Sequence, residues 1–355
     1  MVCELATAQV VSGCEVTVLC GVLGPAAAAA ADHGVRVLEV SSLRHAPSPI
    51  GDTQAVRTLV HEFRAWKPDL VHTHSSKGGL IGRIAAKRVG VPSVYTAHGW
   101  PFQAGAARTQ RLMSVVGEWI GARLGDEVVC VTEAEVELAA RFRIGTVRHR
   151  HLIHNGVASV PAVVRPARTA DQAFHVVMVA RLDRPKRPDI VVRAISLCDK
   201  RVKLQVVGDG ALMAEVRSLV DSLELWGRVE LLGDSDPGPS LAQANCFVLV
   251  SDYEGMPVTV LEAMRSGLPI VANPLPGIVE AVVGSNGDSQ VALLVAGQPE
   301  TVATAVMSLV DNPARAYELG LAGRNRWHAY FSADRMCAEY GELYRSVLAT
   351  SSKST

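Results

Sequence analysis

The sequence lacks the cysteine patterns of metal-binding and disulfide-stabilised proteins. Its seven cysteines include no Cys-x-x-Cys pair, and most lie in apolar stretches that resemble strands. Cysteines in such surroundings are typically buried free thiols of a reducing compartment. We therefore expect a cytoplasmic protein without disulfide bonds or a zinc site.

An excess of one charge and a long hydrophobic run are also missing. Lysine plus arginine and aspartate plus glutamate both total 35, so no overall positive field is available to hold a nucleic acid. No run of about 18 apolar residues is present, and the first residues have no basic segment followed by an apolar core. We expect no nucleic-acid partner, no transmembrane helix and no signal peptide, so that any anionic ligand is bound by a local site.

Short apolar, β-rich runs alternate with helical patterns along most of the chain. This alternation is typical of βαβ units and predicts an α/β fold with mostly parallel sheets. A length of 355 residues suits two such domains. A segment with two prolines and no periodicity, 161–172, is the predicted linker between Rossmann-like domains at 1–160 and 161–325. We expect the two domains to face each other across a cleft and the helical residues 326–355 to pack back on the first one.

The most informative segment is SDYEGMPVTVLEAMRSGLPIVA, residues 251–272. Glu254 lies in a loop after an expected strand, and Glu262 lies in a helix that should stop at Gly267. Backbone N–H groups at a strand end and a helix start form a natural site for a diphosphate or for sugar oxygens. One carboxylate could accept sugar hydroxyls and the other ribose hydroxyls; alternatively, Glu254 is an ordinary loop charge and Glu262 a solvated helix residue.

A cationic loop follows an expected strand in ARLDRPKRPDIVVRAI, residues 180–195. Arg181 and Lys186 stand between this strand and the next helix, where a cation is well placed to neutralise a diphosphate leaving group. Cations in loops are more often simply solvated. The position at a strand end favours a functional role for Arg181 and Lys186, and less so for Arg187.

Two other loops of the second half contain aspartate and are weaker signals. The first has a glycine-flanked aspartate at a strand end: Gly208, Asp209 and Gly210. Glycines there would allow close approach of a nucleotide, although any tight turn also needs them. The second, Asp234-Ser235-Asp236, has the Asp-x-Asp form of some metal-dependent sugar transferases. Because it precedes Pro237, we interpret it as a turn and predict no metal.

Histidines mark two strand ends of the first half. The first strand end carries His74, Ser75 and Lys77, which we expect on the acceptor side of the cleft, and the second carries His98. His98 could contact a transferred sugar or its acceptor. His72 and His74 share one strand face, which raises the question of a metal site. No third ligand at zinc spacing accompanies them, so packing or hydrogen bonding is the favoured interpretation.

These segments, in this order, resemble the family 4, or group 1, retaining glycosyltransferases, which have the GT-B fold. The family's E-x7-E motif matches Glu254 and Glu262, and its Arg/Lys pair matches Arg181 and Lys186. The resemblance implies that Glu254 contacts the donor sugar and Glu262 the ribose. It also implies a donor site lined by Gly255, Met256, Pro257 and Val258, with His98 near the reacting sugar.

The resemblance further implies a metal-independent enzyme that moves a hexose-type sugar from a nucleotide diphosphate, UDP in preference to GDP. Residues 74–102 are similar to bacterial enzymes that assemble capsule, exopolysaccharide or O-antigen units on lipid carriers. The expected acceptor is a saccharide, free or lipid-linked. Two alternatives stay open: a nucleotide-sugar epimerase or hydrolase of the same fold, and a non-catalytic sugar-binding partner.

Two expectations concern the first domain. Residues 1–12 resemble the end of a first helix, so the family's first strand and glycine-rich loop are expected to be missing. A lipid-linked acceptor would draw this domain to the inner face of the plasma membrane as a peripheral protein. Local cations could assist there: Lys77, Arg83, Lys87 and Arg88.

Overall fold

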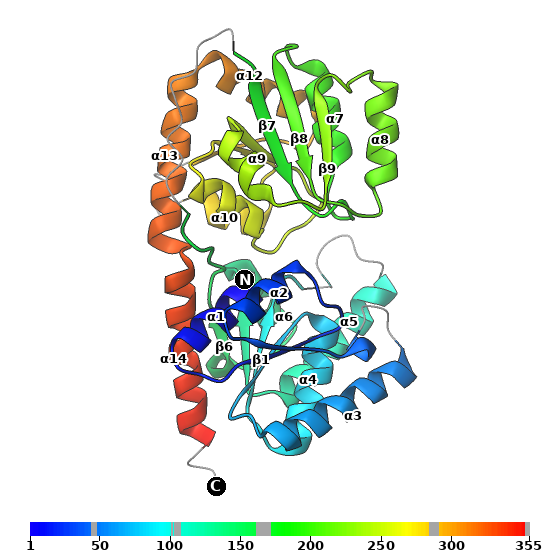
Figure 1. Cartoon of the computed structure of the whole chain (residues 1–355), viewed down its shortest axis with the longest axis vertical. Helices are drawn as coiled ribbons and strands as arrows, with labels where there is room; N and C mark the ends of the chain where they lie inside the picture. Colours follow the sequence, from blue (N-terminus) through cyan, green and yellow to red (C-terminus); the bar gives the residue numbers. More distant parts are fainter. Residues whose placement is uncertain (44–47, 101, 103–107, 161–171, 284–290, 352–355) are drawn as a thin grey trace. The chain divides into compact units, whose positions relative to one another are not determined.

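The computed structural model describes residues 1–43, 48–100, 102, 108–160, 172–283 and 291–351. The chain divides into two compact units, Met1–Ala158 with Ala333–Thr355, and Ser159–Ser332 (Figure 1). The predicted linker lies outside the described residues except for its last residue, Gln172. The first division falls close to the one expected near residue 160, whereas the second follows Ser332 rather than residue 325.

The second unit is built on one parallel sheet of six strands in the order β12-β11-β10-β7-β8-β9. Its strands are β7 (Phe174–Val179), β8 (Val202–Val207), β9 (Val229–Gly233), β10 (Cys246–Leu249), β11 (Ile270–Ala272) and β12 (Ala292–Leu294). Its helices are α7 (Pro188–Leu197), α8 (Met213–Ser222), α9 (Pro237–Gln243), α10 (Val258–Arg265), α11 (Pro276–Val282), α12 (Pro299–Asp311) and α13 (Pro313–Tyr330). β7, β8 and β10 are apolar and mostly buried, as expected for strands covered on both faces.

The strand order of this sheet reverses between β7 and β10. From β7 the chain proceeds outward through β8 and β9, and it then returns to the other side of β7 for β10, β11 and β12. This reversal is a topological switch point at the carboxyl ends of β7 and β10. In open α/β sheets this is the place where ligands bind.

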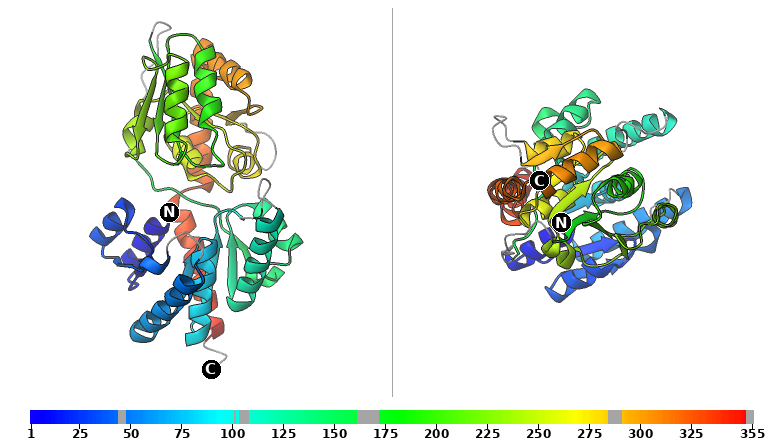
Figure 2. Two further views of the ribbon diagram at one scale, coloured as in Figure 1. Left: turned by 90° about the vertical axis from the view of Figure 1, so that its right-hand side faces the viewer. Right: turned by 90° about the horizontal axis from the view of Figure 1, so that it is seen from above.

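The first unit contains two separate parallel sheets among its described residues (Figure 2). One pairs β1 (Thr17–Cys20) with β2 (Arg36–Glu39), and the other has the order β3 (Val71–His74), β4 (Ser93–Ala97), β5 (Glu127–Cys130), β6 (Arg150–Leu152). The helices are α1 (Val2–Val11), α2 (Pro25–Asp32), α3 (Pro49–Trp66), α4 (Ser76–Val89), α5 (Arg108–Leu124), α6 (Glu133–Arg141) and α14 (Ala333–Ser351). The chain thus opens on a helix, and no described strand joins β1 to β3.

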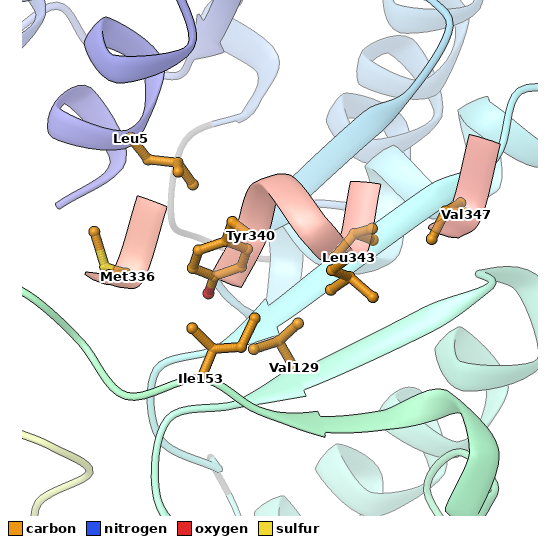
Figure 3. Close-up of a cluster of buried hydrophobic side chains, with 8 residues drawn as sticks. Leu5, Val129, Ile153, Met336, Tyr340, Leu343 and Val347 are labelled. Carbon is orange, nitrogen blue, oxygen red and sulfur yellow. The ribbon is translucent and has the colours of Figure 1, made fainter. Parts of the chain in front are cut away.

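The last helix belongs to the core of the first unit. α14 packs Met336, Tyr340, Leu343 and Val347 against Val129 of β5 and its neighbours (Figure 3). Leu5 of α1 contacts the same cluster. These apolar positions recur every three or four residues along α14, so that one stripe of the helix is buried.

The remaining expectations about composition have mixed outcomes. All seven cysteines are free, but only Cys130, Cys198 and Cys246 are buried, and Cys14 is exposed. The interpretation of the cysteines as buried thiols is therefore wrong for Cys14. None of the helices in the described part of the chain is long and apolar enough to cross a membrane.

Candidate active site

Lys186 and Glu254 meet in the loops that follow β7 and β10. The Lys186 ammonium pairs with Glu254 Oε1, and both side chains are mostly buried, 17% and 10% exposed. Ser251, two residues after β10, donates its hydroxyl to the same carboxylate oxygen at 2.5 Å. Two residues that the sequence singled out separately, 68 positions apart, therefore form one contact. A cation and an anion held here can serve a ligand that carries both phosphate charge and hydroxyl groups.

Backbone hydrogen bonds fix this pair in place. Arg187 N donates to Val250 O at 3.0 Å, and Asp252 N donates to Pro185 O at 2.9 Å. These two bonds join the loop after β7 to the loop after β10. On the other side of β10, the Asn273 side chain donates to Ser251 O at 2.8 Å and accepts from Ser251 N at 3.1 Å. Sequence reasoning missed Asn273, because an amide after a strand carries no signal until its partner is known.

Gly208 and Gly210 are required by a neighbouring loop. Both have positive φ, 129° and 159°. A Cβ on Gly208 would lie 1.9 Å from Ala180 O, and one on Gly210 would lie 2.6 Å from Leu182 O. The loops after β7 and β8 therefore run against each other, and Asp209 O accepts from Leu182 N at 2.9 Å. The close approach expected for a nucleotide is, in this structure, an approach of backbone to backbone.

The segment after Glu254 forms a loop and then α10. Pro257 precedes the helix and Val258 is its first residue, so Glu262 lies just over one turn into α10. Gly267 has φ 66° and follows the helix end, as predicted. Met256 and Pro257 are buried. Glu262 is partly exposed.

Gly277 is a second residue that the sequence did not reveal. It lies in the first turn of α11, and a Cβ there would be 1.6 Å from Gly255 O. No side chain other than hydrogen fits at this contact. The backbone of the Glu254–Met256 loop therefore packs directly against the start of α11. This contact fixes the position of the loop.

Arg181 and Arg187 have different surroundings. The Arg181 side chain is 83% exposed, and its described ion pair with Asp183 is loose at 3.9 Å. Arg187 instead binds both oxygens of Asp189, at 2.9 and 2.8 Å, and Asp252 at 3.3 Å. These hydrogen bonds, led by the one to Asp189, raise the pKa of the Arg187 guanidinium. Arg187 is therefore a structural cation, whereas Arg181 can turn toward a ligand.

In the first unit, the predicted histidines form a row. His74, at the end of β3, lies 3.0 Å from His98 between Nδ1 and Nε2, and the rings are stacked. His72 bonds the hydroxyls of Tyr344 at 2.6 Å and Thr96 at 2.7 Å, which confirms its hydrogen-bonding role. Burial lowers the pKa of His72 to about 3, so this ring is neutral at pH 7. Burial and the neighbouring imidazoles also hold the pKa of His74 well below its ordinary value.

The other polar residues of this strand end have different surroundings. Ser75 is exposed, has φ 61° and precedes α4 without capping it through its side chain. Lys77 pairs with Asp52 of α3 at 2.8 Å. Arg83 is 1% exposed and bound to the buried Glu118 at 3.0 Å, so the expectation that it meets a membrane is wrong. Lys87 remains exposed near the end of α4.

The Asp-x-Asp segment has a structural role. Asp236 caps α9 by accepting a hydrogen bond from Gly238 N at 3.0 Å. Such a cap explains an aspartate before Pro237 without reference to a metal. Within the residues that the structure describes, no three His, Cys, Asp or Glu side chains are grouped so that they could hold a metal ion.

The two halves of the sequence match two families of sugar-transferring domains. Residues 173–312 match the family described as glycosyl transferases group 1, and residues 1–156 match the glycosyl transferase 4-like domain. A UDP-Gal:alpha-D-GlcNAc-diphosphoundecaprenol alpha-1,3-galactosyltransferase of Escherichia coli is 30% identical over 263 residues, 69% of this chain and 68% of that protein. The chain belongs to the group 1 glycosyltransferases.

Other relatives of this glycosyltransferase support the assignment. An alpha-maltose-1-phosphate synthase of Mycolicibacterium smegmatis is 30% identical over 313 residues, 79% of each chain. The HepE protein of Anabaena, solved in complex with UDP-glucose, superposes with a TM-score of 0.81 over 97% of this chain and 94% of that one, at 20% identity. A sucrose-phosphate synthase of Thermosynechococcus elongatus gives 0.81 over 98% and 92%, at 23% identity. The fold is therefore GT-B, as expected from the sequence.

Proposed function

We propose that this glycosyltransferase moves a hexose from a UDP-sugar to a lipid-linked saccharide acceptor, with retention of the anomeric configuration and without a metal. The observation that carries the proposal is the Lys186–Glu254 pair at the strand-order reversal of the second unit. The Escherichia coli relative is named for a UDP-Gal donor and a diphosphoundecaprenol-linked acceptor. Synthesis of a surface polysaccharide is the biological setting that we infer.

In this proposal the second unit stabilises the leaving group. Arg181, exposed at the end of β7, and Lys186 balance the charge that develops on the UDP as the sugar departs. Glu254 and Glu262 accept hydroxyls of the sugar and the ribose. The acceptor hydroxyl attacks the sugar face from which the UDP leaves. These two cations take the place of a metal, so we expect activity to persist in EDTA.

The test must distinguish the loss of the Lys186 or Glu254 charge from the loss of folded protein. Replacing only Lys186 or only Glu254 leaves the other charge buried without its partner, which destabilises the protein. The double variant Lys186→Met/Glu254→Gln removes both charges and should fold. We expect it to lower kcat/KM for UDP-galactose or UDP-glucose by at least about 100-fold, with an unchanged circular dichroism spectrum. Lys203→Ala, at an exposed position of β8, is the matched control.

The assay uses a prenyl-diphosphate-linked saccharide as acceptor, with EDTA present, and follows UDP release and the anomeric configuration of the product. Near-normal turnover by the folded double variant would overturn the assignment of this pair. An inverted product would overturn retention. Consumption of the donor at the same rate with and without acceptor would identify a hydrolase instead.

A further inference from the structure

Helix α5 of the first unit has two apolar faces, only one of which is buried. On the inner face Glu118 and Gly121 are buried, and Val115 and Ala122 pack against the core around Tyr95 and Trp100. The outer face exposes five large apolar side chains: Leu112 (66%), Met113 (76%), Val116 (47%), Trp119 (40%) and Ile120 (43%). Scattered exposed apolar residues are ordinary, but a contiguous patch of this kind marks an interaction surface.

The spacing makes these residues one stripe. Successive turns of α5 carry 112 and 113, then 116, then 119 and 120, so the five side chains lie together on the outer side of the helix. Arg123 continues the stripe by one turn, and its guanidinium carbon lies 3.3 Å from the ring centre of Trp119. An arginine that stacks on an apolar surface keeps its charge at the edge of that surface.

The exposed charges on the described side chains of α5 itself are both positive, Arg111 and Arg123. Arg111 is exposed at the first described side-chain position of α5, and its guanidinium faces the Phe142 ring at 5.8 Å. Arg141 and Arg143, on either side of Phe142, are also exposed. The one carboxylate among the described side chains of α5 is Glu118, which is bound by Arg83 and by the Tyr95 hydroxyl at 3.1 Å.

We propose that this outer face of α5, with Arg111 and Arg123 at its two ends, docks on the surface of an anionic lipid bilayer. Apolar side chains that include a tryptophan, bordered by arginines, are what a helix lying in the headgroup region presents. Anionic lipids neutralise each arginine near the surface. The inference rests on the proposed function, because a lipid-linked acceptor holds its sugar at such a surface.

A second copy of the chain fits this face less well. In an antiparallel two-fold pairing along the stripe, Arg111 of one copy would lie opposite Arg123 of the other. In a parallel pairing each arginine would meet its own counterpart. Either arrangement brings like charges together at an apolar contact, and the described side chains of α5 offer no free carboxylate to offset them.

Vesicle co-sedimentation tests the proposal with the full chain. We expect binding to vesicles that contain phosphatidylglycerol, with much weaker binding to phosphatidylcholine alone or at high salt. The variant Leu112→Gln/Ile120→Gln should reduce partition at least about tenfold, because it removes two large side chains from the buried area. Ile50→Gln, at an isolated apolar position of α3 that is 84% exposed, should bind as the unmodified chain does.

Further measurements keep this inference separate from the proposed function. Leu112→Gln/Ile120→Gln should retain UDP binding by calorimetry and turnover of a water-soluble acceptor, and should lose turnover only of acceptor held in vesicles. Absence of turnover in every variant, with vesicle binding intact, would overturn the proposed function and not the docking surface. Failure of the unmodified chain to bind phosphatidylglycerol vesicles, or a dimer in ultracentrifugation that Leu112→Gln/Ile120→Gln abolishes, would overturn the docking surface.

Discussion

At the scale of single residues, Gly277 has the sharpest expected effect on donor use. Alanine at this position would place a methyl group 1.6 Å from Gly255 O, so the loop that holds Glu254 must move. A displacement of about 1 Å in a positioning loop costs roughly 100-fold in rate. We expect Gly277→Ala to lower kcat/KM for the UDP-sugar by about that factor, measured by UDP release.

Gly227→Ala is the matched control for Gly277→Ala. A Cβ at Gly227 meets nothing within 4 Å, and the residue is exposed in the same unit. It should leave the rate unchanged. If Gly277→Ala turned over donor as fast as Gly227→Ala, the close packing of the Glu254–Met256 loop against α11 would have no catalytic importance.

Sequence reasoning identified the charged residues at this scale but not their contacts. Glu254 and Lys186 were recognisable because each stands at an expected strand end beside a helix start. Their pairing depends on which strands are neighbours, and β10 lies beside β7 only because the strand order reverses. Gly277 and Asn273 were missed for the same reason, since each acts on a loop more than 20 residues away in the chain.

At the scale of elements, alternating apolar runs and helical patterns predicted the parallel strands of both units except β6. What they did not reveal is which helix face stays exposed. The sequence of α5 is apolar on two sides, and a helix apolar all round is usually buried. Only the placement of Trp119 and Leu112 on the side away from Tyr95 shows that one face has no covering element among the described residues.

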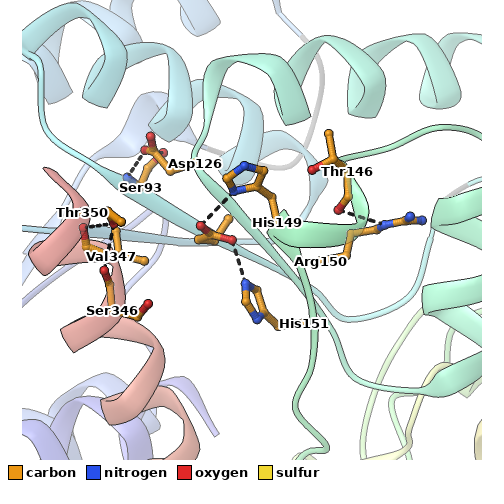
Figure 4. Close-up of polar contacts among 10 residues, drawn as sticks. Ser93, Asp126, Thr146, His149, Arg150, His151, Ser346, Val347 and Thr350 are labelled. Atoms are coloured by element: carbon orange, nitrogen blue, oxygen red, sulfur yellow. Dashed lines mark hydrogen bonds and ion pairs between the residues drawn. The ribbon is translucent and has the colours of Figure 1, made fainter. Parts of the chain in front are cut away.

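The pairing of β5 with β6 contains a pH-sensitive contact. The Glu127 carboxylate accepts hydrogen bonds from His149 at 3.0 Å and His151 at 2.7 Å (Figure 4). Burial alone would raise the pKa of Glu127, but the hydrogen bonds from His151 and His149 outweigh it, and the pKa is lowered below 4.5. A lowered folded-state pKa stabilises the protein above the unfolded value, and this contribution is lost as the pH falls through the folded-state value.

We therefore expect the free energy of unfolding of the first unit to decrease as the pH falls below about 4.5, in part through Glu127. Urea denaturation at a series of pH values measures this decrease. Glu127→Gln should make it smaller. Glu137→Gln, at an exposed position of α6, should leave it unchanged. Equal pH dependence in Glu127→Gln and in the unmodified chain would show that the contact contributes nothing.

At the scale of the whole molecule, the chain leaves the first unit after Ala158 and returns to it at Ala333. The sequence predicted helical residues at 326–355, and α14 begins within that range, at Ala333. The position of the return was harder to predict, because α13 and α14 are both helical and only their buried partners tell them apart. Gly320 of α13 approaches Gly267 of the second unit, whereas Tyr340 of α14 packs beside Val129 of the first.

Because α14 belongs to the first unit, we expect a substitution in its buried face to destabilise only that unit. Leu343 is buried in the cluster of Figure 3, so Leu343→Ala should destabilise that unit by about 3 kcal/mol. Hydrogen exchange read by mass spectrometry should then quicken in β4 and β5, while β7 and β8 keep their protection. Leu348→Ala, five residues further along α14 at an exposed position, should change neither set. Equal loss of protection in both units after Leu343→Ala would contradict this prediction. It would show that the two units unfold together and that the stability of the second unit also depends on α14.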